Sequence, residues 1–264
     1  MNNESISIKS HNFSKKFGQN FITDTNLLSA IVSDAEIGEQ DLVLEVGAGA
    51  GTLTEALCSK AKYVVSYEID KTLEPLLSSR LSECKNLEII YKDALKEHSE
   101  VILAKFNAPY KVVANLPYYI TTPLIFKFLE DIENIQSITV MVQKEVAERI
   151  TSKEGNKTYG IISAIVQFYA SAQIKRIVKR DMFFPSPDVD SAVLHLVRTD
   201  KYTSRCKPLV FSKCVQTAFA MRRKTLLNNL SAGYGFSKAD ALQILALSGL
   251  NPLVRGEEIG RAHV

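Results

Sequence analysis

The sequence has 264 residues, 46% of them hydrophobic and 23% charged. A chain of this length and composition can bury a substantial core, which excludes a disordered chain and a small disulfide-stapled domain. The four cysteines form no CxxC pair, so we expect reduced thiols and no metal site. The longest apolar run, 161–172, is too short to cross a bilayer, and we see no signal or import sequence at the N-terminus. We therefore expect a cytoplasmic protein without a membrane segment.

The net charge of +3 hides an asymmetry along the chain. Residues 1–198 carry 22 Lys and Arg against 25 Asp and Glu, a net charge of −3, whereas residues 199–264 carry 10 against 4, a net charge of +6. A basic C-terminal segment suits a polyanion such as RNA, although a solvated helical face explains most short basic runs.

From Asp41 onward, short β-branched or apolar runs alternate with helix-like stretches. We predict strands at 42–46, 63–67, 87–91, 112–114 and 138–142, with helices at 53–59, 73–81 and 123–129 between them. The alternation is typical of βαβ units, in which helices cover a parallel sheet. A buried helix at 160–172 and strands at 174–178 and 189–197 follow.

Beyond Asp200 the apolar spacing predicts helices only, and the polar stretch 199–207 with Pro208 is typical of a linker. We therefore predict an α/β domain at 1–200, which begins with a basic arm, and a small all-helical RNA-contacting domain at 201–258. The last six residues, 259–264, can be written in the codons of a common sequencing adapter, and we interpret them as a non-native tail.

A glycine-rich segment, Glu45 to Thr52, follows the first predicted strand and opens a predicted helix. Its glycines, Gly47, Gly49 and Gly51, would let the backbone approach a ligand at the end of the sheet where open α/β folds bind ligands. Thr52 stands where a dinucleotide fingerprint has its third glycine, and Glu45 would repel a phosphate. A cationic ligand without phosphate fits better, so we predict S-adenosylmethionine as the cofactor and keep a nicotinamide dehydrogenase as a weaker alternative.

Two further acids end the next two strands. Glu68 lies where an acid can accept hydrogen bonds from both ribose hydroxyls, and Asp93 could accept one from the adenine amino group of the cofactor. Each acid by itself could be an ordinary surface carboxylate. Three acids at three successive strand ends favour a cofactor site.

The segment Asn115-Leu116-Pro117-Tyr118 follows the fourth strand. The Asn115 side-chain oxygen and the Leu116 carbonyl could accept both hydrogens of an adenine amino group and direct its nitrogen lone pair at a methyl donor. Pro117 would stiffen the turn, and Tyr118 would stack on the extruded base. Such a transfer depends on orientation and charge placement and needs no metal. An ordinary Pro-containing loop is the alternative.

Two aromatic residues precede the last predicted strand, in the segment 183–187. Its two prolines would hold an aromatic ring rigidly at the end of the sheet. We expect Phe183 to cover the other face of the base, and core packing is the alternative for Phe184.

These motifs, together with Phe17-Gly18-Gln19-Asn20-Phe21 and FFPSPDVDSA at 183–192, resemble the ribosomal RNA adenine dimethyltransferase family, small-subunit branch, over nearly the whole chain. The resemblance implies a Rossmann-like class I methyltransferase fold with a small helical domain. It also implies a monomer that dimethylates two adjacent adenosines in the 3′-terminal hairpin of small-subunit (16S) rRNA, late in small-subunit assembly. The loop has Ala48 and Ala50 where many members carry Pro or Leu.

Carried over by motif position, the resemblance implies base contacts at Asn115, Leu116, Tyr118 and Phe183. The implied cofactor contacts are Asn20, Ile22, Gly47, Glu68, Asp93 and Asn115. It also implies that Arg222, Arg223 and Lys224, on a predicted helix, contact the rRNA backbone. A second basic group, Lys175, Arg176, Lys179 and Arg180, either extends that surface or is solvated charge.

Two alternative functions stay open. One is the large-subunit branch, which methylates a single rRNA adenine and confers macrolide resistance; Leu116 and the segment 190–192 favour the small-subunit branch. The other is a ribosome-assembly factor that binds RNA without chemistry, and the presence of Asn115 and Glu68 argues against it.

Overall fold

The structure is a computed structural model of the chain, and it describes residues 21–22, 24–130, 134–221 and 223–259. The helices are α2 (Thr25–Asp34), α3 (Thr52–Cys58), α4 (Glu74–Arg80), α5 (Ser99–Leu103), α6 (Tyr118–Glu130), α7 (Lys144–Thr151), α8 (Ile161–Tyr169), α9 (Pro208–Phe219), α10 (Leu226–Tyr234) and α11 (Lys238–Leu247). The strands are β1 (Phe21–Ile22), β2 (Leu42–Val46), β3 (Tyr63–Tyr67), β4 (Leu87–Ile90), β5 (Tyr110–Ala114), β6 (Ile135–Gln143), β7 (Ala170–Val178), β8 (Phe183–Phe184) and β9 (Ser191–Arg198). Short 3₁₀ turns occupy η2 (Lys71–Leu73), η3 (Arg180–Met182) and η4 (Gly256–Glu258).

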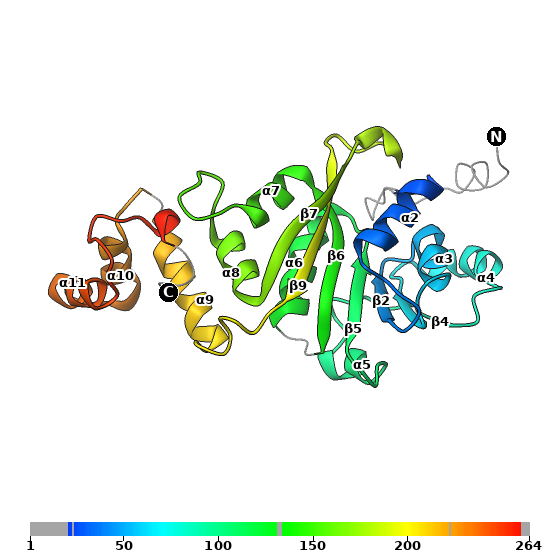
Figure 1. The fold of residues 1–264 in the computed structure, drawn as a ribbon, viewed down its shortest axis with the longest axis horizontal. Helices are drawn as coiled ribbons and strands as arrows, with labels where there is room; N and C mark the ends of the chain where they lie inside the picture. Colours follow the sequence, from blue (N-terminus) through cyan, green and yellow to red (C-terminus); the bar gives the residue numbers. More distant parts are fainter. Residues whose placement is uncertain (1–20, 23, 131–133, 222, 260–264) are drawn as a thin grey trace. The chain divides into compact units, whose positions relative to one another are not determined.

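Seven strands form one sheet in the order β4-β3-β2-β5-β6-β9-β7 (Figure 1). The pairs from β4 through β6 are parallel, and β9 runs antiparallel beside β6. Counted along the chain within this sheet, the order is 3-2-1-4-5-7-6. A dinucleotide-binding sheet has the order 3-2-1-4-5-6 without the inserted antiparallel strand, so the topology separates this fold from the nicotinamide dehydrogenases.

The predicted strands 42–46 and 63–67 are confirmed with the same limits, and the other three predicted parallel strands are each present. The predicted helix 160–172 is wrong at its end, because α8 stops at Tyr169 and the backbone of Ala170 is already extended. Ala170 and Ala172 are good helix formers, so their own preference would continue the helix. Pairing of β7 at the edge of the sheet decides their conformation.

One face of the sheet is covered by α2 and α3. The strands contribute Val43, Val64, Val113, Met141 and Val193 to this core. Four apolar side chains of α2 pack on them, Leu27, Leu28, Ile31 and Val32, together with Leu53 and Leu57 of α3. Because β2 ends at Val46 and α3 begins at Thr52, the glycine loop between them lies at the carboxyl end of β2.

The direction in which the chain adds strands reverses at β2. From β2 the chain continues to β3 on one side, and β5 later pairs with the other side of β2. The loops that leave the carboxyl ends of β2 and β5 therefore diverge, and such a switch point is where open α/β sheets bind ligands.

The chain forms two compact units, residues 1–144 with 173–197 and residues 145–172 with 198–264. The second unit combines the segment from α7 to α8 with the C-terminal helices, whereas the predicted boundary separated only the residues beyond 200. The predicted limits 1–200, 201–258 and 259–264 remain predictions, and residues 260–264 lie outside the described residues. In the described part of the chain, no helix is both long and apolar enough to cross a membrane.

The second unit has its own core. Its C-terminal helices bury Ala218, Leu226, Leu230, Ala241 and Leu245 together. Phe168 of α8 stacks on Phe211 of α9 with ring centroids 3.9 Å apart. The backbone at Gly256 passes so close that an added Cβ would lie 2.4 Å from the Ala218 carbonyl oxygen.

We expect Phe211→Ala to lower the free energy of unfolding by about 3–5 kcal/mol, since the ring is 1% exposed and leaves a cavity against Phe168. Chemical denaturation of the full chain measures this change. Leu209→Ala on the same helix is the matched control, because Leu209 is 83% exposed. A loss of similar size in both variants would contradict the assigned core.

Candidate active site

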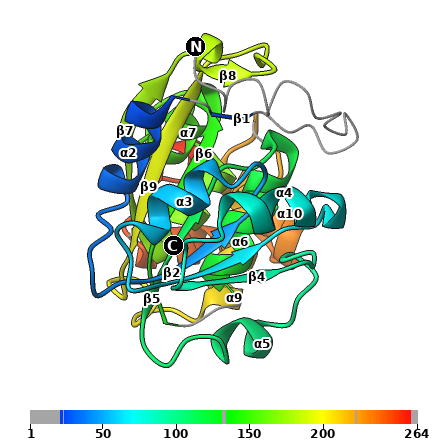
Figure 2. The same ribbon diagram turned by 90° about the vertical axis from the view of Figure 1, so that its right-hand side faces the viewer.

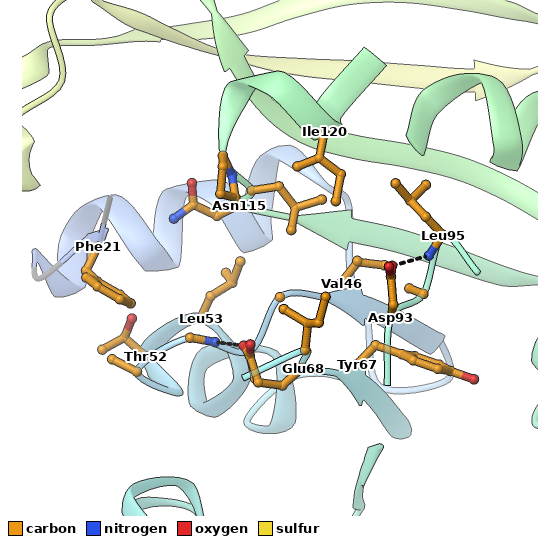
Figure 3. Close-up of a pocket in the computed structure, with 18 of the residues that line it drawn as sticks. Phe21, Val46, Thr52, Leu53, Tyr67, Glu68, Asp93, Leu95, Asn115 and Ile120 are labelled. Atoms are coloured by element: carbon orange, nitrogen blue, oxygen red, sulfur yellow. Dashed lines mark hydrogen bonds between the residues drawn. The ribbon is translucent and has the colours of Figure 1, made fainter. Parts of the chain in front are cut away.

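A cavity of about 320 Å³ opens at the carboxyl ends of β2, β3, β4 and β5, at the switch point (Figure 3). The segments at the ends of these strands line it. They are residues 46–50 and 52–53 at β2, 67–69 at β3, 92–95 at β4, and 115–117, 119, 120 and 123 at β5. Phe21, Ile22 and Leu28 complete the lining. The structure thus brings the predicted glycine loop, two of the predicted acids and the predicted base-binding segment to a single cavity.

The glycine loop is held open by backbone conformations that favour glycine. Gly47, Gly49 and Gly51 have φ of 85°, 54° and 79°. A Cβ on Gly47 would lie 2.7 Å from the Leu116 side chain, and one on Gly49 would lie 3.0 Å from the Phe21 ring. Gly47 and Gly49 line the cavity, whereas Gly51 does not and instead packs under α4, with an added Cβ 3.0 Å from Leu77.

Glu68 lies on the floor of the cavity and is 2% exposed. Its two carboxylate oxygens accept hydrogen bonds from the backbone N–H groups of Gly49 at 2.7 Å and Asp70 at 2.8 Å. Burial raises the pKa of Glu68, and these N–H donors oppose the rise. Each oxygen keeps acceptor capacity, so this side chain could receive a pair of hydroxyl donors from a ligand.

Asp93 lies farther along the same wall of the cavity (Figure 3). One carboxylate oxygen accepts from the Leu95 backbone N–H at 3.0 Å, and the other lies 3.7 Å from the Lys96 ammonium. The first contact fixes the turn after β4 and leaves the carboxylate at the cavity surface, where it could accept a donor from a ligand.

Glu45 does not line the cavity, so its predicted direct contact with a ligand is not seen in this structure. Its carboxylate is fully buried behind the glycine loop, where one oxygen accepts from Thr54 Oγ1 at 2.7 Å and Ser66 Oγ at 2.6 Å. The other oxygen is buried without a hydrogen-bond partner. Burial raises the pKa of Glu45 from 4.5 to about 7. The hydrogen bonds from Ser66 and Thr54 lower it, and the nearby charge of Glu68 raises it further.

Asn115, Leu116 and Pro117 line the cavity, and Figure 3 shows Asn115 across from Glu68. The Pro117 carbonyl accepts from the Ile120 N–H at 3.1 Å and from Thr121 Oγ1 at 3.2 Å, which starts α6 directly after the segment. Tyr118 is among the residues that do not line the cavity, and its hydroxyl is hydrogen-bonded to Ser191 Oγ at 2.7 Å. The ring of Tyr118, which was predicted to stack on the base, is therefore anchored to β9.

The N-terminal segment closes another side of the cavity. Phe21 and Ile22 line it, and Thr52 Oγ1 donates to the Ile22 carbonyl at 3.2 Å, which ties the segment to the start of α3. The predicted cofactor contact Asn20 lies outside the described residues.

Most of the other cavity residues were not predicted, and Tyr119 and Ile69 are two of them. Tyr119 is 69% exposed and Ile69 is 50% exposed, and both line the cavity. Tyr119 directly follows Tyr118, a predicted site residue at the start of α6, and Ile69 directly follows Glu68, the predicted acid after β3. Their position next to these residues was the only signal in the sequence, because a single tyrosine or isoleucine has no motif of its own.

The aromatic pair that follows η3 is placed differently from the expectation. Phe183 is 6% exposed and belongs to the core that α2 and α3 form on the sheet, and it does not line the cavity. Phe184 is 41% exposed, although core packing was the alternative considered for it. The predicted stacking role of Phe183 stays a prediction.

Of the predicted RNA-contacting cluster, Arg223 and Lys224 are exposed, and Arg222 lies outside the described residues. Arg223 and Lys224 do not lie on a helix as predicted, because α9 ends at Phe219 and these two residues lie in a turn before α10. The Asn229 side-chain amide donates to the carbonyls of Ala218 and Met221, which caps α9 before it reaches the cluster.

The second basic group is largely paired with acids. Lys175 bonds Glu36 at 2.9 Å, Arg176 bonds Asp34, and Lys179 bonds Asp190 at 2.8 Å. Arg176 thereby joins β7 to α2, Lys175 joins β7 to the turn after α2, and Lys179 joins the end of β7 to the residue before β9. These pairs favour the structural interpretation over a phosphate-binding surface.

Within the described ranges, no group of three His, Cys, Asp or Glu side chains is arranged to hold a metal ion. The inserted antiparallel strand, the glycine loop and the acid at the end of β3 define a class I methyltransferase fold. Solved structures agree, since a dimethyladenosine transferase from Plasmodium falciparum matches with a TM-score of 0.79 at 26% identity, over 92% of this chain and 94% of that chain. The 23S rRNA methyltransferase ErmE matches with a TM-score of 0.71 at 26% identity, over 90% of this chain and 96% of that chain.

The chain belongs to the ribosomal RNA adenine dimethylase family, whose profile matches residues 10–255. It is 42% identical over 260 residues to the ribosomal RNA small subunit methyltransferase A of Streptococcus equi subsp. zooepidemicus, covering 94% of this chain and 88% of the relative. The protein of the same name from Lactococcus lactis is 42% identical over 259 residues, covering 94% of this chain and 86% of the relative.

We expect the stability advantage of Glu45→Gln over the wild type to be larger at pH 8 than at pH 5. The folded state holds the Glu45 proton up to pH about 7 and the unfolded state only to about 4.5, so wild-type stability falls as the pH rises through this window. Between pH values below 4.5 and above about 7, the wild type loses about 3 kcal/mol of its free energy of unfolding, and Glu45→Gln does not. Denaturation at both pH values measures it.

Glu39→Gln, the same change at an exposed position, is the control. An advantage of Glu45→Gln that is equal at the two pH values would show that the buried carboxyl does not titrate between them.

Proposed function

We propose that this protein transfers methyl groups from S-adenosylmethionine to the N6 amino groups of two adjacent adenosines in the 3′-terminal hairpin of small-subunit (16S) rRNA. The substrate would be the RNA or the immature small ribosomal subunit in the cytoplasm, late in subunit assembly. One observation supports the proposal above the others: the glycine loop, Glu68 and Asn115 line a single cavity at the switch point.

The residues of the cavity fit the proposed cofactor. Side chains at Gly47 or Gly49 would collide with Leu116 or Phe21, so the bare backbone leaves room for a ligand against the loop. Glu68 would accept hydrogen bonds from the two ribose hydroxyls, Asp93 would accept one from the adenine amino group, and Ile69 offers an apolar surface beside them. When bound, S-adenosylmethionine supplies an electrophilic methyl group. The contacts at Asn20, Ile22 and Asn115 are part of the same proposal.

Glu45 would act on the cofactor only from behind the loop. Its bonds to Thr54 of α3 and Ser66 of β3 join two elements whose neighbouring residues line the cavity. At neutral pH its carboxyl carries part of a negative charge, because its pKa is about 7. This charge would favour a cationic ligand and disfavour a phosphate.

Asn115 and Leu116 are the groups that would activate the adenine. The amino nitrogen is a poor nucleophile because its lone pair is delocalised into the ring. Hydrogen bonds from its two N–H groups to the Asn115 side-chain oxygen and the Leu116 carbonyl would localise the lone pair on nitrogen and orient it. Pro117 holds these acceptors at the start of α6, and Tyr118 would stack on the base.

The relatives favour the small-subunit branch. Proteins at 42% identity are named as small-subunit methyltransferases, whereas the large-subunit enzyme ErmE is 26% identical to this chain. Product mapping tests the choice: after incubation with labelled cofactor, mass spectrometry should find dimethyladenosine at two adjacent positions in small-subunit RNA or an immature subunit. Label in protein-free large-subunit RNA instead would overturn it.

We expect Asn115→Ala to abolish methyl transfer while RNA affinity stays within about threefold, since the variant removes an acceptor for the amino group and no phosphate contact. Transfer of labelled methyl groups and filter binding of the RNA measure the two effects. Asn107→Ala, an exposed asparagine before the other end of β5, is the matched control. Unchanged turnover in Asn115→Ala would refute the assigned role.

We expect Arg223→Ala combined with Lys224→Ala to weaken RNA binding, because the two side chains would neutralise backbone phosphates. The slope of log affinity against log salt should become shallower by about 1 for each phosphate that is no longer neutralised. Cofactor affinity should stay the same. Lys175→Ala is the control, because Lys175 is already paired with Glu36. If the salt slope is the same as in the wild type, these two side chains do not bind the RNA backbone.

A further inference from the structure

Ser191 is the first residue of β9, which runs antiparallel beside β6 (Figure 2). It lies opposite Gln143, the last residue of β6. On the other side of β6, Ala114 at the end of β5 lies opposite Val140, three residues before Gln143. At about 3.3 Å per residue, Ser191 therefore lies about 10 Å beyond the end of β5, at the edge of the sheet where the segment 115–118 begins.

The Ser191 side chain makes a hydrogen bond to this segment. Ser191 is 0% exposed, and its Oγ lies 2.7 Å from the hydroxyl of Tyr118, the first residue of α6. A buried hydroxyl requires such a partner, because burial removes it from water. The bond joins the residue after Pro117 to β9, a strand that is not adjacent to β5 in the sheet.

Asp190, the residue before Ser191, is held from two sides. Its carbonyl accepts a hydrogen bond from the Lys144 N–H at 3.0 Å. Its carboxylate accepts one from the Arg180 N–H at 3.1 Å and one from the Lys179 ammonium at 2.8 Å. These contacts tie the start of β9 to the start of α7 and to the segment after β7, so the backbone at Ser191 is a fixed point.

Tyr118 is thereby held at both ends. Its backbone follows Pro117, whose carbonyl accepts the first hydrogen bonds of α6, and its hydroxyl is bonded to Ser191. The side chain has two rotatable bonds between the backbone and the ring, and a contact at the hydroxyl restricts both of them. The half-buried ring is therefore limited to one orientation.

We propose that Ser191 is a positioning residue for methyl transfer, which holds the Tyr118 ring in the orientation that stacks on the target adenine. This inference rests on the proposed function, in which the adenine lies at Asn115 and Leu116. Ser191 does not line the cavity and acts through Tyr118. Orientation of the base contributes to the rate of transfer, whereas contacts with backbone phosphates dominate RNA affinity.

The test breaks the hydrogen bond from each side in the full-length chain. Ser191→Ala removes one hydroxyl, Tyr118→Phe removes the other and keeps the ring, and a double variant combines the two changes. Ser191→Thr keeps the hydroxyl. Ser137→Ala in β6 is the matched control, because Ser137 is 6% exposed and its hydroxyl has no hydrogen-bond partner among the described residues.

The readouts are the single-turnover rate of methyl transfer to RNA in an immature small subunit, the affinities for RNA and cofactor, and Tm. We expect Ser191→Ala and Tyr118→Phe each to lower the rate about five- to tenfold, the scale of one hydrogen bond. Both affinities should stay within about twofold. The double variant should be no slower than the slower single variant, because both changes remove the same bond. Ser191→Thr should recover most of the rate, and Ser137→Ala should keep the wild-type rate.

Nuclear magnetic resonance of the protein with ring-labelled tyrosine measures the positioning without the reaction. The Tyr118 signal is identified by its absence in Tyr118→Phe. It should shift in Ser191→Ala and stay unchanged in Ser137→Ala.

Four results would overturn the proposal: an unchanged rate in Ser191→Ala, an unchanged Tyr118 signal in that variant, losses that multiply in the double variant, or an equal loss in Ser137→Ala. If Ser191→Ala does not fold, a wild-type rate in Tyr118→Phe has the same meaning. A wild-type protein that transfers no methyl group would instead contradict the proposed function, and the Tyr118 signal would still show whether Ser191 holds the ring.

Discussion

The hydrogen bond from the Gly49 N–H to Glu68 is the contact on which the site depends. It joins the loop after β2 to the loop after β3 at 2.7 Å, and it requires the positive φ of Gly49 that directs the N–H toward the carboxylate. Gly47 and Gly49 cannot carry side chains here, because Leu116 and Phe21 leave no room for them. The parallel register of β2 with β3 and β5 brings the three loops to one edge.

Two buried carboxylates support this arrangement in different ways. Glu68 faces the cavity and is stabilised by backbone N–H donors, whereas Glu45 lies behind the loop and is held by two hydroxyl groups. Burial raises the pKa of both, but only Glu45 has a fully buried oxygen without a partner. A charged group in that position costs stability, which is typical of sites where function constrains the residue.

The ladder of β1 and β8 connects the two ends of the first unit's sequence. Phe21 comes from the start of the described chain and Phe184 from the segment before β9, and their pairing brings an N-terminal wall of the cavity next to an exposed ring. The bond from Thr52 to the Ile22 carbonyl extends this connection to α3. Closure of the cavity at this end and presentation of the ring to solvent therefore share one small piece of backbone.

The sequence by itself determined the βαβ pattern, the glycine loop, Glu68, Asp93 and the Asn115 segment, because strand periodicity, glycine spacing and acids at strand ends are local signals. It also predicted the family, which the comparisons confirm. Only the tertiary structure decided that Glu45 lies behind the loop, that Gly51 packs on α4, and that Phe183 rather than Phe184 is buried. These outcomes depend on which face of an element meets another element, and α8 gives way to β7 at Ala170 because β7 pairs at the sheet edge. Such contacts join residues far apart in the chain, and no local pattern encodes them.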